Sequence, residues 1–154
     1  MSKIVKLLIS LALPQLAGGL GAIFTITSVQ SWYLTINRPS WNPPNWLFGP
    51  VWTLLYILMG IACYLIWKSE HPQKKQLLTL YFIQLVLNAL WSPAFFGMES
   101  PILGLVVIIP LWVMILLCIF QFRKVNKWAS ILMVPYLFWV SFATALNFAI
   151  WYLN

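Results

Sequence analysis

The stretch Trp32–Tyr56, WYLTINRPSWNPPNWLFGPVWTLLY, is the most informative part of this chain, because it joins two strongly apolar segments without becoming polar itself. It is rich in tryptophan and proline, and Arg38 is its only charged residue. Connections between helices are usually polar and mobile. This one is aromatic and stiffened by proline, whose ring fixes the backbone angle φ. We therefore expect residues 28–46 to form a lid over a cavity that opens toward one membrane surface.

The composition of the whole chain is that of an integral membrane protein. Its 154 residues are 62% hydrophobic and only 7% charged, with a mean hydropathy of +0.89, whereas roughly 25% of residues are charged in soluble domains. A helix needs about 20 apolar residues to cross a bilayer. We expect an all-α membrane protein, in which residues 1–154 form one five-transmembrane-helix bundle. The segments that meet this length are 4–27, 47–67, 77–96, 102–120 and 128–153.

The basic residues predict the orientation of these spans. Arg38 alone falls on the side of the first loop, and the remaining basic residues fall on the other side. Under the positive-inside rule the N-terminus is cytoplasmic, and the first loop and the C-terminus lie outside a bacterial plasma membrane. The net charge of +7 then reflects orientation and contact with anionic membrane lipid, and no nucleic-acid partner is implied. The residues on the cytoplasmic side are Lys3, Lys6, Lys68, Lys74, Lys75, Arg123, Lys124 and Lys127.

The sequence lacks the residues of common catalytic and metal sites. Glu70 and Glu99 are the only acids and fall in opposite loops, and His71 is the only histidine. Cys63 and Cys118 lie within apolar spans, where a single cysteine usually behaves as a small hydrophobic residue. We expect no metal site, no required cofactor and no conventional acid–base enzyme. The absence of carboxylates within the spans also counts against proton-coupled transport.

Aromatic and neutral polar side chains instead repeat on single faces of three spans. These residues are Trp52 and Tyr56 in the second span, Asn88, Trp91 and Ser92 in the third, and Trp139, Ala143 and Asn147 in the fifth. If the three faces converge, they form an aromatic pocket with a few hydrogen-bond donors, which is the usual form of a site for an apolar ligand. Two purely structural roles stay open for these side chains, since such polar residues often join neighbouring membrane helices and tryptophans often anchor helix ends at the interface.

Four motifs, in order along nearly the whole chain, resemble those of the translocator protein family. They are Trp41-Asn-Pro-Pro44, Gly49-Pro-Val-Trp52 with Tyr56, Asn88-Ala-Leu-Trp91-Ser92, and Pro135-Tyr136 through Trp139 to Leu146-Asn147. Bacterial members of this family are called tryptophan-rich sensory proteins, and animal members are called peripheral benzodiazepine receptors. The resemblance implies a five-helix receptor, usually a homodimer, that binds porphyrins such as protoporphyrin IX and drug-like isoquinoline or benzodiazepine ligands below the first loop.

The resemblance also assigns ligand-binding residues. Pro43 and Pro44 would shape the lid. For a porphyrin ligand, Arg38 with Asn37 and Asn42 is the set available to hold the propionates, and Tyr33 and Tyr56 are poor candidates for an axial ligand. The residues expected to line the pocket are Trp52, Tyr56, Asn88, Trp91, Ser92, Trp139, Ala143 and Asn147. No residue is assigned as certainly catalytic. If the protein promotes light-dependent breakdown of a bound porphyrin, Trp52 and Trp139 are the residues that take part.

Two departures from the family pattern narrow these expectations. Asn42 stands where many relatives carry an ionisable residue, which removes an axial haem ligand from the lid. Phe148 stands where a cholesterol motif needs tyrosine, and no basic residue follows it, so we expect no specific cholesterol binding. Two other functions remain open, a passive transporter or scavenger of tetrapyrroles and a regulatory subunit of another membrane protein.

Small residues offer two candidate faces for a homodimer. Gly18 with Ala22 and Ala17 with Gly21 allow a close helix approach in the first span, although the same surface can pack inside the monomer. The third span offers another face, formed by Ala89, Pro93 and Gly97.

Overall fold

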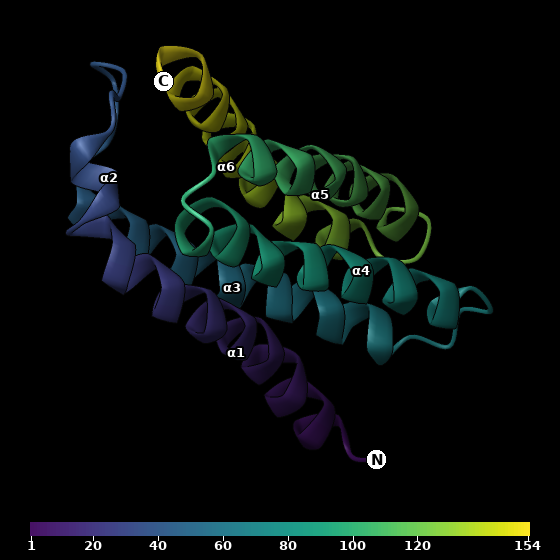
Figure 1. The fold of residues 1–154 in the computed structure, drawn as a ribbon. Coiled ribbons are helices and arrows are strands. Elements are labelled where there is room, and N and C mark those ends of the chain that lie inside the picture. The colour runs from purple at the N-terminus through teal and green to yellow at the C-terminus, as the bar shows by residue number, and fades with distance from the viewer.

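The chain folds as a bundle of long helices without strands in a computed structural model that describes residues 1–154 (Figure 1). Five of its helices are long and apolar enough to cross a membrane, counting α4 together with the π-helical turn η1 that continues it. The predicted fold class, an all-α membrane bundle of five spans, is therefore confirmed. The elements are α1 (Lys3–Val29), α2 (Trp32–Thr35), α3 (Asn45–Trp67), α4 (Lys74–Ser92), η1 (Pro93–Gly97), α5 (Pro101–Phe122) and α6 (Lys127–Leu153).

Side chains that cap the backbone mark where three of the spans begin. The hydroxyl of Ser2 accepts from the N–H of Val5 at the start of α1, and the hydroxyl of Ser100 accepts from Leu103 N–H at the start of α5, both at 3.2 Å. The Asn126 side chain accepts from the first N–H groups of α6. Caps of this kind satisfy donors that have no partner within the helix. The spans begin within about three residues of the predicted positions, and the short helix α2 within the first loop was not predicted.

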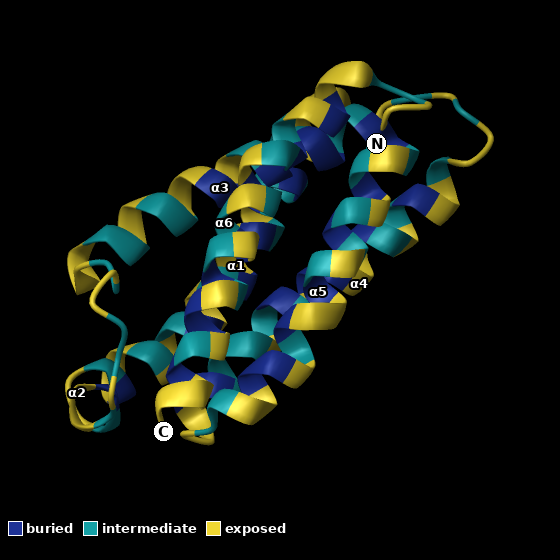
Figure 2. Cartoon of the chain, turned by 90° about the horizontal axis from the view of Figure 1, so that it is seen from above, coloured by how far each residue is buried: buried dark blue, intermediate teal, exposed yellow.

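Buried residues alternate with exposed ones along each helix (Figure 2), and the buried side chains form two clusters. The larger cluster joins α3, α4, α5 and α6 and contains fully buried aromatic side chains such as Tyr81, Tyr136 and Phe122. The smaller cluster combines Tyr33 of α2 with Phe95 and Phe96 of η1, and with α6. The first loop is thus packed against the ends of the third and fifth spans.

Helices α1 and α3 are in close contact at Gly60. A Cβ atom at this position would lie 2.7 Å from the backbone oxygen of Ser10 and 3.0 Å from the Cα of Leu11. Only glycine therefore fits without moving the backbone of α1. Close approach through small residues is a common way to pack helices in membranes, where lipid provides no hydrophobic drive for association.

The glycines of α1 serve the monomer's own packing. A Cβ at Gly18 would overlap a ring carbon of Tyr56, and one at Gly21 would lie 3.3 Å from the hydroxyl of Ser92. Gly97 of the third span likewise abuts Phe24. Of the two roles considered for these small residues, packing inside the monomer is the one observed at Gly18, Gly21 and Gly97.

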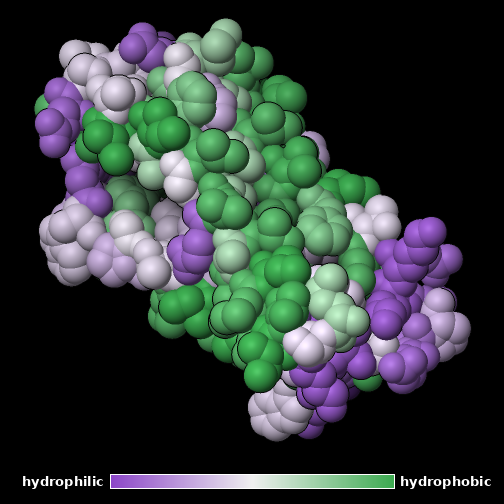
Figure 3. Space-filling view, turned by 90° about the horizontal axis from the view of Figure 1, so that it is seen from below, coloured by the Kyte–Doolittle hydropathy of each residue, from purple (hydrophilic) through white to green (hydrophobic).

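The two ends of the bundle differ in character. The N-terminus, the α3–α4 connection and the α5–α6 connection lie at one end, whereas α2, the first loop and the C-terminus lie at the other, which we call the lid end (Figure 1). At the first end, the ammonium of Lys6 lies 5.8 Å from the ring of Trp67, which brings the start of α1 to the end of α3. Hydrophilic residues gather at both ends with a broad apolar surface between them, and this surface is hollowed near the lid end (Figure 3).

Gly60→Ala is expected to lower the thermal unfolding midpoint of the purified protein. The added methyl group meets backbone atoms that cannot rotate away, and overpacking of this kind costs about 1–3 kcal/mol. Gly19→Ala is the matched control, because nothing lies within 4 Å of its added Cβ and alanine favours a helix over glycine. The midpoint of Gly19→Ala should stay constant or rise, and an equal fall in both variants would contradict the assigned contact.

Candidate functional site

A cavity of about 580 Å³ lies inside the lid end of the bundle. It is lined by 30 residues, of which 18 are hydrophobic, drawn from every spanning helix, from η1 and from α2. The volume falls within the roughly 300–1,000 Å³ of small-molecule sites, and the mostly apolar lining is also typical of them. This is therefore the candidate functional site.

Most of the residues predicted from the sequence line this cavity. Arg38, Pro43 and Pro44 are the exceptions, because the structure does not place them on its wall. Its roof is formed by Tyr33 of α2 and by the first turns of α3, including Asn45 and Phe48, rather than by the proline loop. The predicted residues on the wall are Tyr33, Trp52, Tyr56, Asn88, Trp91, Ser92, Trp139, Ala143 and Asn147.

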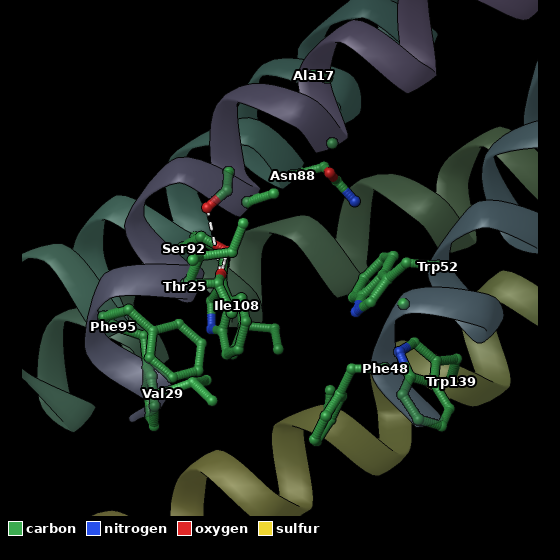
Figure 4. Close-up of a pocket in the computed structure, with 18 of the residues that line it drawn as sticks. Ala17, Thr25, Val29, Phe48, Trp52, Asn88, Ser92, Phe95, Ile108 and Trp139 are labelled. Carbon is green, nitrogen blue, oxygen red and sulfur yellow. Dashed lines mark hydrogen bonds between the residues drawn. The ribbon is translucent and has the colours of Figure 1, made fainter. Parts of the chain in front are cut away.

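One side of the cavity is a set of aromatic rings (Figure 4). Trp52 stacks on Tyr56, with ring centroids 5.6 Å apart and an angle of 26° between the planes. Trp139 meets Trp52 at 6.4 Å and 90°, and Phe48 meets Trp139 at 6.0 Å and 70°. Stacked and edge-to-face geometries are the favoured arrangements of aromatic pairs. The rings hold one another in place, so the wall is formed before any ligand arrives.

The facing side of the cavity is built by α1 and the end of the third span. Thr25 donates a hydrogen bond to the hydroxyl of Ser92 at 3.2 Å, and Phe95 lies beside this pair in Figure 4. Phe95 reaches the cavity because the chain forms a wider π-helical turn after Ser92, with the N–H of Met98 bonded to the carbonyl of Pro93. Its ring stacks on Trp91 at 5.2 Å and 20°.

Sequence reasoning missed Phe48 and Phe95. A signal for both exists in the helical period, since Phe48 lies four residues before Trp52 and Phe95 lies four residues after Trp91. The π-helical turn could not be anticipated, because Pro93 at this position suggests only a kink.

The two asparagines on the wall are already hydrogen-bonded within the protein. Asn147 accepts from the indole N–H of Trp91 at 3.0 Å and donates to the carbonyl of Pro101 at 2.8 Å. Asn88 accepts from the Tyr56 hydroxyl at 3.3 Å and donates to the hydroxyl of Tyr136 at 2.8 Å. Both amides hold helices together, as membrane asparagines often do. In the structure these bonds fix the shape of the wall and use one N–H of each amide, so the prediction that the amides donate to a ligand depends on the second N–H.

Trp139 carries the polar group that the wall leaves unused. Its indole N–H is buried and has no hydrogen-bond partner in the protein. A buried donor without a partner costs about 1–3 kcal/mol, so such groups are rare and usually have a specific cause. The nitrogens of Trp139 and Trp52 lie on the side of their rings that faces the cavity in Figure 4. The Trp139 nitrogen itself is covered by neighbouring atoms, so an acceptor atom on a flat, apolar ligand would reach it only after surrounding side chains move.

The first loop is held above the site by contacts at several points. The Tyr33 hydroxyl donates to Asn42 at 2.8 Å, and the guanidinium of Arg38 lies 4.9 Å from the Tyr33 ring. Burial raises the pKa of Tyr33 above its ordinary value, although Arg38 and the bond to Asn42 oppose this rise. Tyr33 thus keeps its proton at neutral pH and remains a donor to the loop.

A second set of contacts ties the loop to the end of α6. The side-chain oxygen of Asn154 accepts from the backbone N–H of Asn37 at 3.0 Å, and its amide nitrogen donates to the Asn37 carbonyl at 2.8 Å. Further along the loop, the Trp41 ring meets Phe142 edge-on, with centroids 5.7 Å apart. The loop is therefore anchored to α6, which also carries Trp139.

The rim of the cavity lies along the seam between α1 and α3. The lining residues that are exposed come from these two helices and include several amide and hydroxyl side chains. In a membrane this seam faces lipid, so the cavity is open to molecules that dissolve in the bilayer. These residues are Gln15, Gly19, Ile26 and Gln30 of α1 and Asn45, Gly49 and Thr53 of α3.

Comparison with known proteins gives this site its context. A model of the TspO/MBR family matches residues 10–153. The chain belongs to the TspO/MBR family. It is 46% identical over 151 residues to the tryptophan-rich protein TspO of Archaeoglobus fulgidus, covering 98% of each chain. It is 41% identical over 123 residues to the tryptophan-rich sensory protein of Cereibacter sphaeroides, covering 80% of this chain and 77% of that one.

The animal branch of the TspO/MBR family is also similar. The human translocator protein is 36% identical over 141 residues, covering 90% of this chain and 83% of its own length. Family membership confirms the resemblance stated from the motifs. It also identifies the chain as an integral membrane protein of the sensory and translocator group.

Asn154→Ala is expected to loosen the first loop without unfolding the bundle. The substitution removes both bonds to Asn37, each of which contributes about 0.5–1.5 kcal/mol. Hydrogen exchange at the Asn37 amide should become about tenfold faster or more, while exchange in α3 stays constant. Tyr152→Phe is the control, because Tyr152 is exposed and its ring stacks on Phe148 rather than on the loop. Unchanged exchange in Asn154→Ala would contradict the anchor.

Proposed function

We propose that this protein is a membrane receptor or sensor that binds flat, apolar aromatic ligands, with protoporphyrin IX as the representative tetrapyrrole. One observation carries the proposal, which is the cavity with the interlocking rings of Trp52, Trp139 and Phe48 on its wall. Drug-like isoquinoline and benzodiazepine ligands share the same chemistry, a fused ring system and a carbonyl acceptor. No cofactor, metal or nucleic acid takes part in this proposal.

The energetic argument combines stacking with one hydrogen bond. A tetrapyrrole offers a large π surface to Trp52, Trp139 and Phe48, and aromatic pairs contribute about 0.5–1.5 kcal/mol each beyond the burial of their area. An acceptor atom at Trp139 would also remove the cost of the buried donor. Because the wall is built of interlocking rings, little side-chain entropy is lost on binding. These features favour a rigid aromatic ligand over a flexible lipid chain or a sterol.

The propionates of a porphyrin need donors near water. Arg38 was expected to serve them, but its guanidinium lies over Tyr33 and outside the cavity wall. Gln30 and Asn45 are exposed on the rim at the lid end and carry amide N–H groups. We therefore assign the carboxylates of a bound porphyrin to this rim, with Arg38 contributing only after the loop moves.

The rim between α1 and α3 favours entry from the bilayer. In our proposal the ligand dissolves in the membrane, enters along this seam and rests below the first loop. The N-terminus is cytoplasmic and the lid end faces outward in a bacterial plasma membrane, with the basic end near anionic lipid. The same seam would serve a passive transporter or scavenger of tetrapyrroles, which is the second candidate function. The active unit is proposed to be a homodimer.

Trp139→Phe is expected to weaken protoporphyrin IX binding about tenfold, because phenylalanine keeps an aromatic ring but has no N–H donor. Binding is measured in the dark through the porphyrin's own absorption band, which avoids the change in tryptophan signal. Trp128→Phe is the matched control, since Trp128 is exposed at the opposite end of the bundle. Equal affinities of wild type and Trp139→Phe would contradict the assigned hydrogen bond. No saturable binding by the wild type would contradict the proposed ligand.

The proposal has a further form, in which the protein promotes the light-dependent breakdown of a bound porphyrin. Trp52 and Trp139 lie at right angles with centroids 6.4 Å apart, so a porphyrin packed against this pair would contact two oxidisable indoles. In light and oxygen a bound porphyrin would then break down faster than free porphyrin. Trp52→Phe is expected to slow this breakdown several-fold at equal ligand occupancy, followed as loss of the porphyrin absorption band. An unchanged rate at equal occupancy would exclude Trp52 from the photochemistry.

A further inference from the structure

Behind the cavity wall, a chain of hydrogen bonds runs from Tyr56 into the core. The Tyr56 hydroxyl donates to Asn88 Oδ1 at 3.3 Å, and Asn88 Nδ2 donates to the hydroxyl oxygen of Tyr136 at 2.8 Å. The Tyr136 hydroxyl then donates to Gln84 Oε1 at 3.0 Å. Tyr56 and Asn88 lie on the cavity wall, whereas Tyr136 and Gln84 are fully buried behind it.

The direction of the chain follows from its buried end. A tyrosine hydroxyl has one proton and two lone pairs. Because the proton of Tyr136 goes to Gln84, its oxygen accepts from Asn88, and the amide of Asn88 therefore presents its oxygen to Tyr56. Reversing the chain would require both amides to turn. Reversal would give the buried Gln84 Nε2, which has no partner in the structure, a bond to Tyr136, but it would leave the Tyr56 proton without a partner beside an apolar cavity.

The ring of Tyr56 is held as firmly as its hydroxyl. Trp52 stacks on the ring, and Gly18 of α1 lies so close that a Cβ there would overlap Cε2 of the ring. The ring therefore keeps the hydroxyl oxygen of Tyr56 beside Asn88. With its proton committed to Asn88, the hydroxyl of Tyr56 has only lone pairs left to offer.

We propose that Gln84, acting through Tyr136 and Asn88, orients the hydroxyl of Tyr56 as a hydrogen-bond acceptor on the cavity wall, so that the site selects ligands carrying an N–H or O–H donor. The inference rests on the proposed function, because it requires the cavity to hold a ligand. Gln84 and Tyr136 are positioning residues that do not touch the ligand. The hydroxyl of Tyr56 would accept from a donor on the ligand, and the indole N–H of Trp139 would donate to an acceptor on the ligand. The wall would therefore recognise a flat aromatic molecule that carries both groups.

Carbazole and dibenzofuran test directly whether the site prefers a ligand that donates a hydrogen bond. The two tricyclic molecules have nearly the same shape, but carbazole carries an N–H donor where dibenzofuran carries an oxygen acceptor. Affinities are measured by fluorescence titration of the full chain in lipid nanodiscs. The wild type is expected to prefer carbazole by about five- to tenfold, the effect of one hydrogen bond. Equal affinities, or a preference for dibenzofuran, would overturn the proposal.

Three variants test whether the hydrogen-bond chain from Gln84 to Tyr56, rather than general packing of the core, sets this preference. In Gln84→Met the Tyr136 proton loses its acceptor and turns to Asn88, which releases the Tyr56 proton toward the cavity. The ratio of the two affinities should therefore fall to about one or invert. Tyr136→Phe breaks the same chain and should also lower the ratio. Leu77→Met changes a buried residue of α4 outside the chain, and its ratio should equal that of the wild type.

The ratio distinguishes orientation from stability, because a merely loosened fold weakens both probes alike. An unchanged ratio of carbazole affinity to dibenzofuran affinity in folded Gln84→Met and Tyr136→Phe would overturn the proposed orientation of Tyr56. If the wild type binds protoporphyrin IX but neither tricyclic probe, the polarity proposal fails and the proposed function stands. If it binds none of the three, both fail.

Discussion

The close contact of α1 with α3 at Gly60 is the constraint on which the rest of the structure depends. The missing side chain lets the two helices meet backbone to backbone near the basic end. Toward the lid end the same two helices flank the cavity, and their exposed residues form its rim. Lipid gives no general force that would close this seam, so helix association depends on specific packing and hydrogen bonds. A tight contact at one end and a cavity at the other are therefore parts of one arrangement.

The cavity is kept open by interactions that its wall makes with itself. Asn147 holds Trp91, Asn88 holds Tyr56, and the aromatic rings meet at stacked or perpendicular angles. Each of these polar groups is satisfied inside the protein, whereas the Trp139 N–H is not. A rigid wall of aromatic rings is suited to recognise a rigid, flat ligand. The first loop, anchored through Asn37 and Tyr33, closes the lid end.

Much of this arrangement was predictable, and the exceptions have physical causes. The five spans follow from apolar length, and the wall residues of α3, α4 and α6 follow from helical periodicity. Phe95 depended on a π-helical turn that no local pattern announces. Arg38 was expected near the propionates of a porphyrin, and its guanidinium lies over the face of Tyr33. This contact depends on the tertiary path of the loop, which the sequence pattern does not show. The commitment of both asparagines to partners on other helices is likewise a tertiary property.

A structure of the protein determined with protoporphyrin IX tests the central claim most directly. We predict the tetrapyrrole below the first loop, stacked against Trp52 and Trp139, with an acceptor atom within about 3 Å of the Trp139 indole nitrogen. A tetrapyrrole bound on the lipid-facing surface, with the cavity unchanged and Trp139 still unpartnered, would contradict the account.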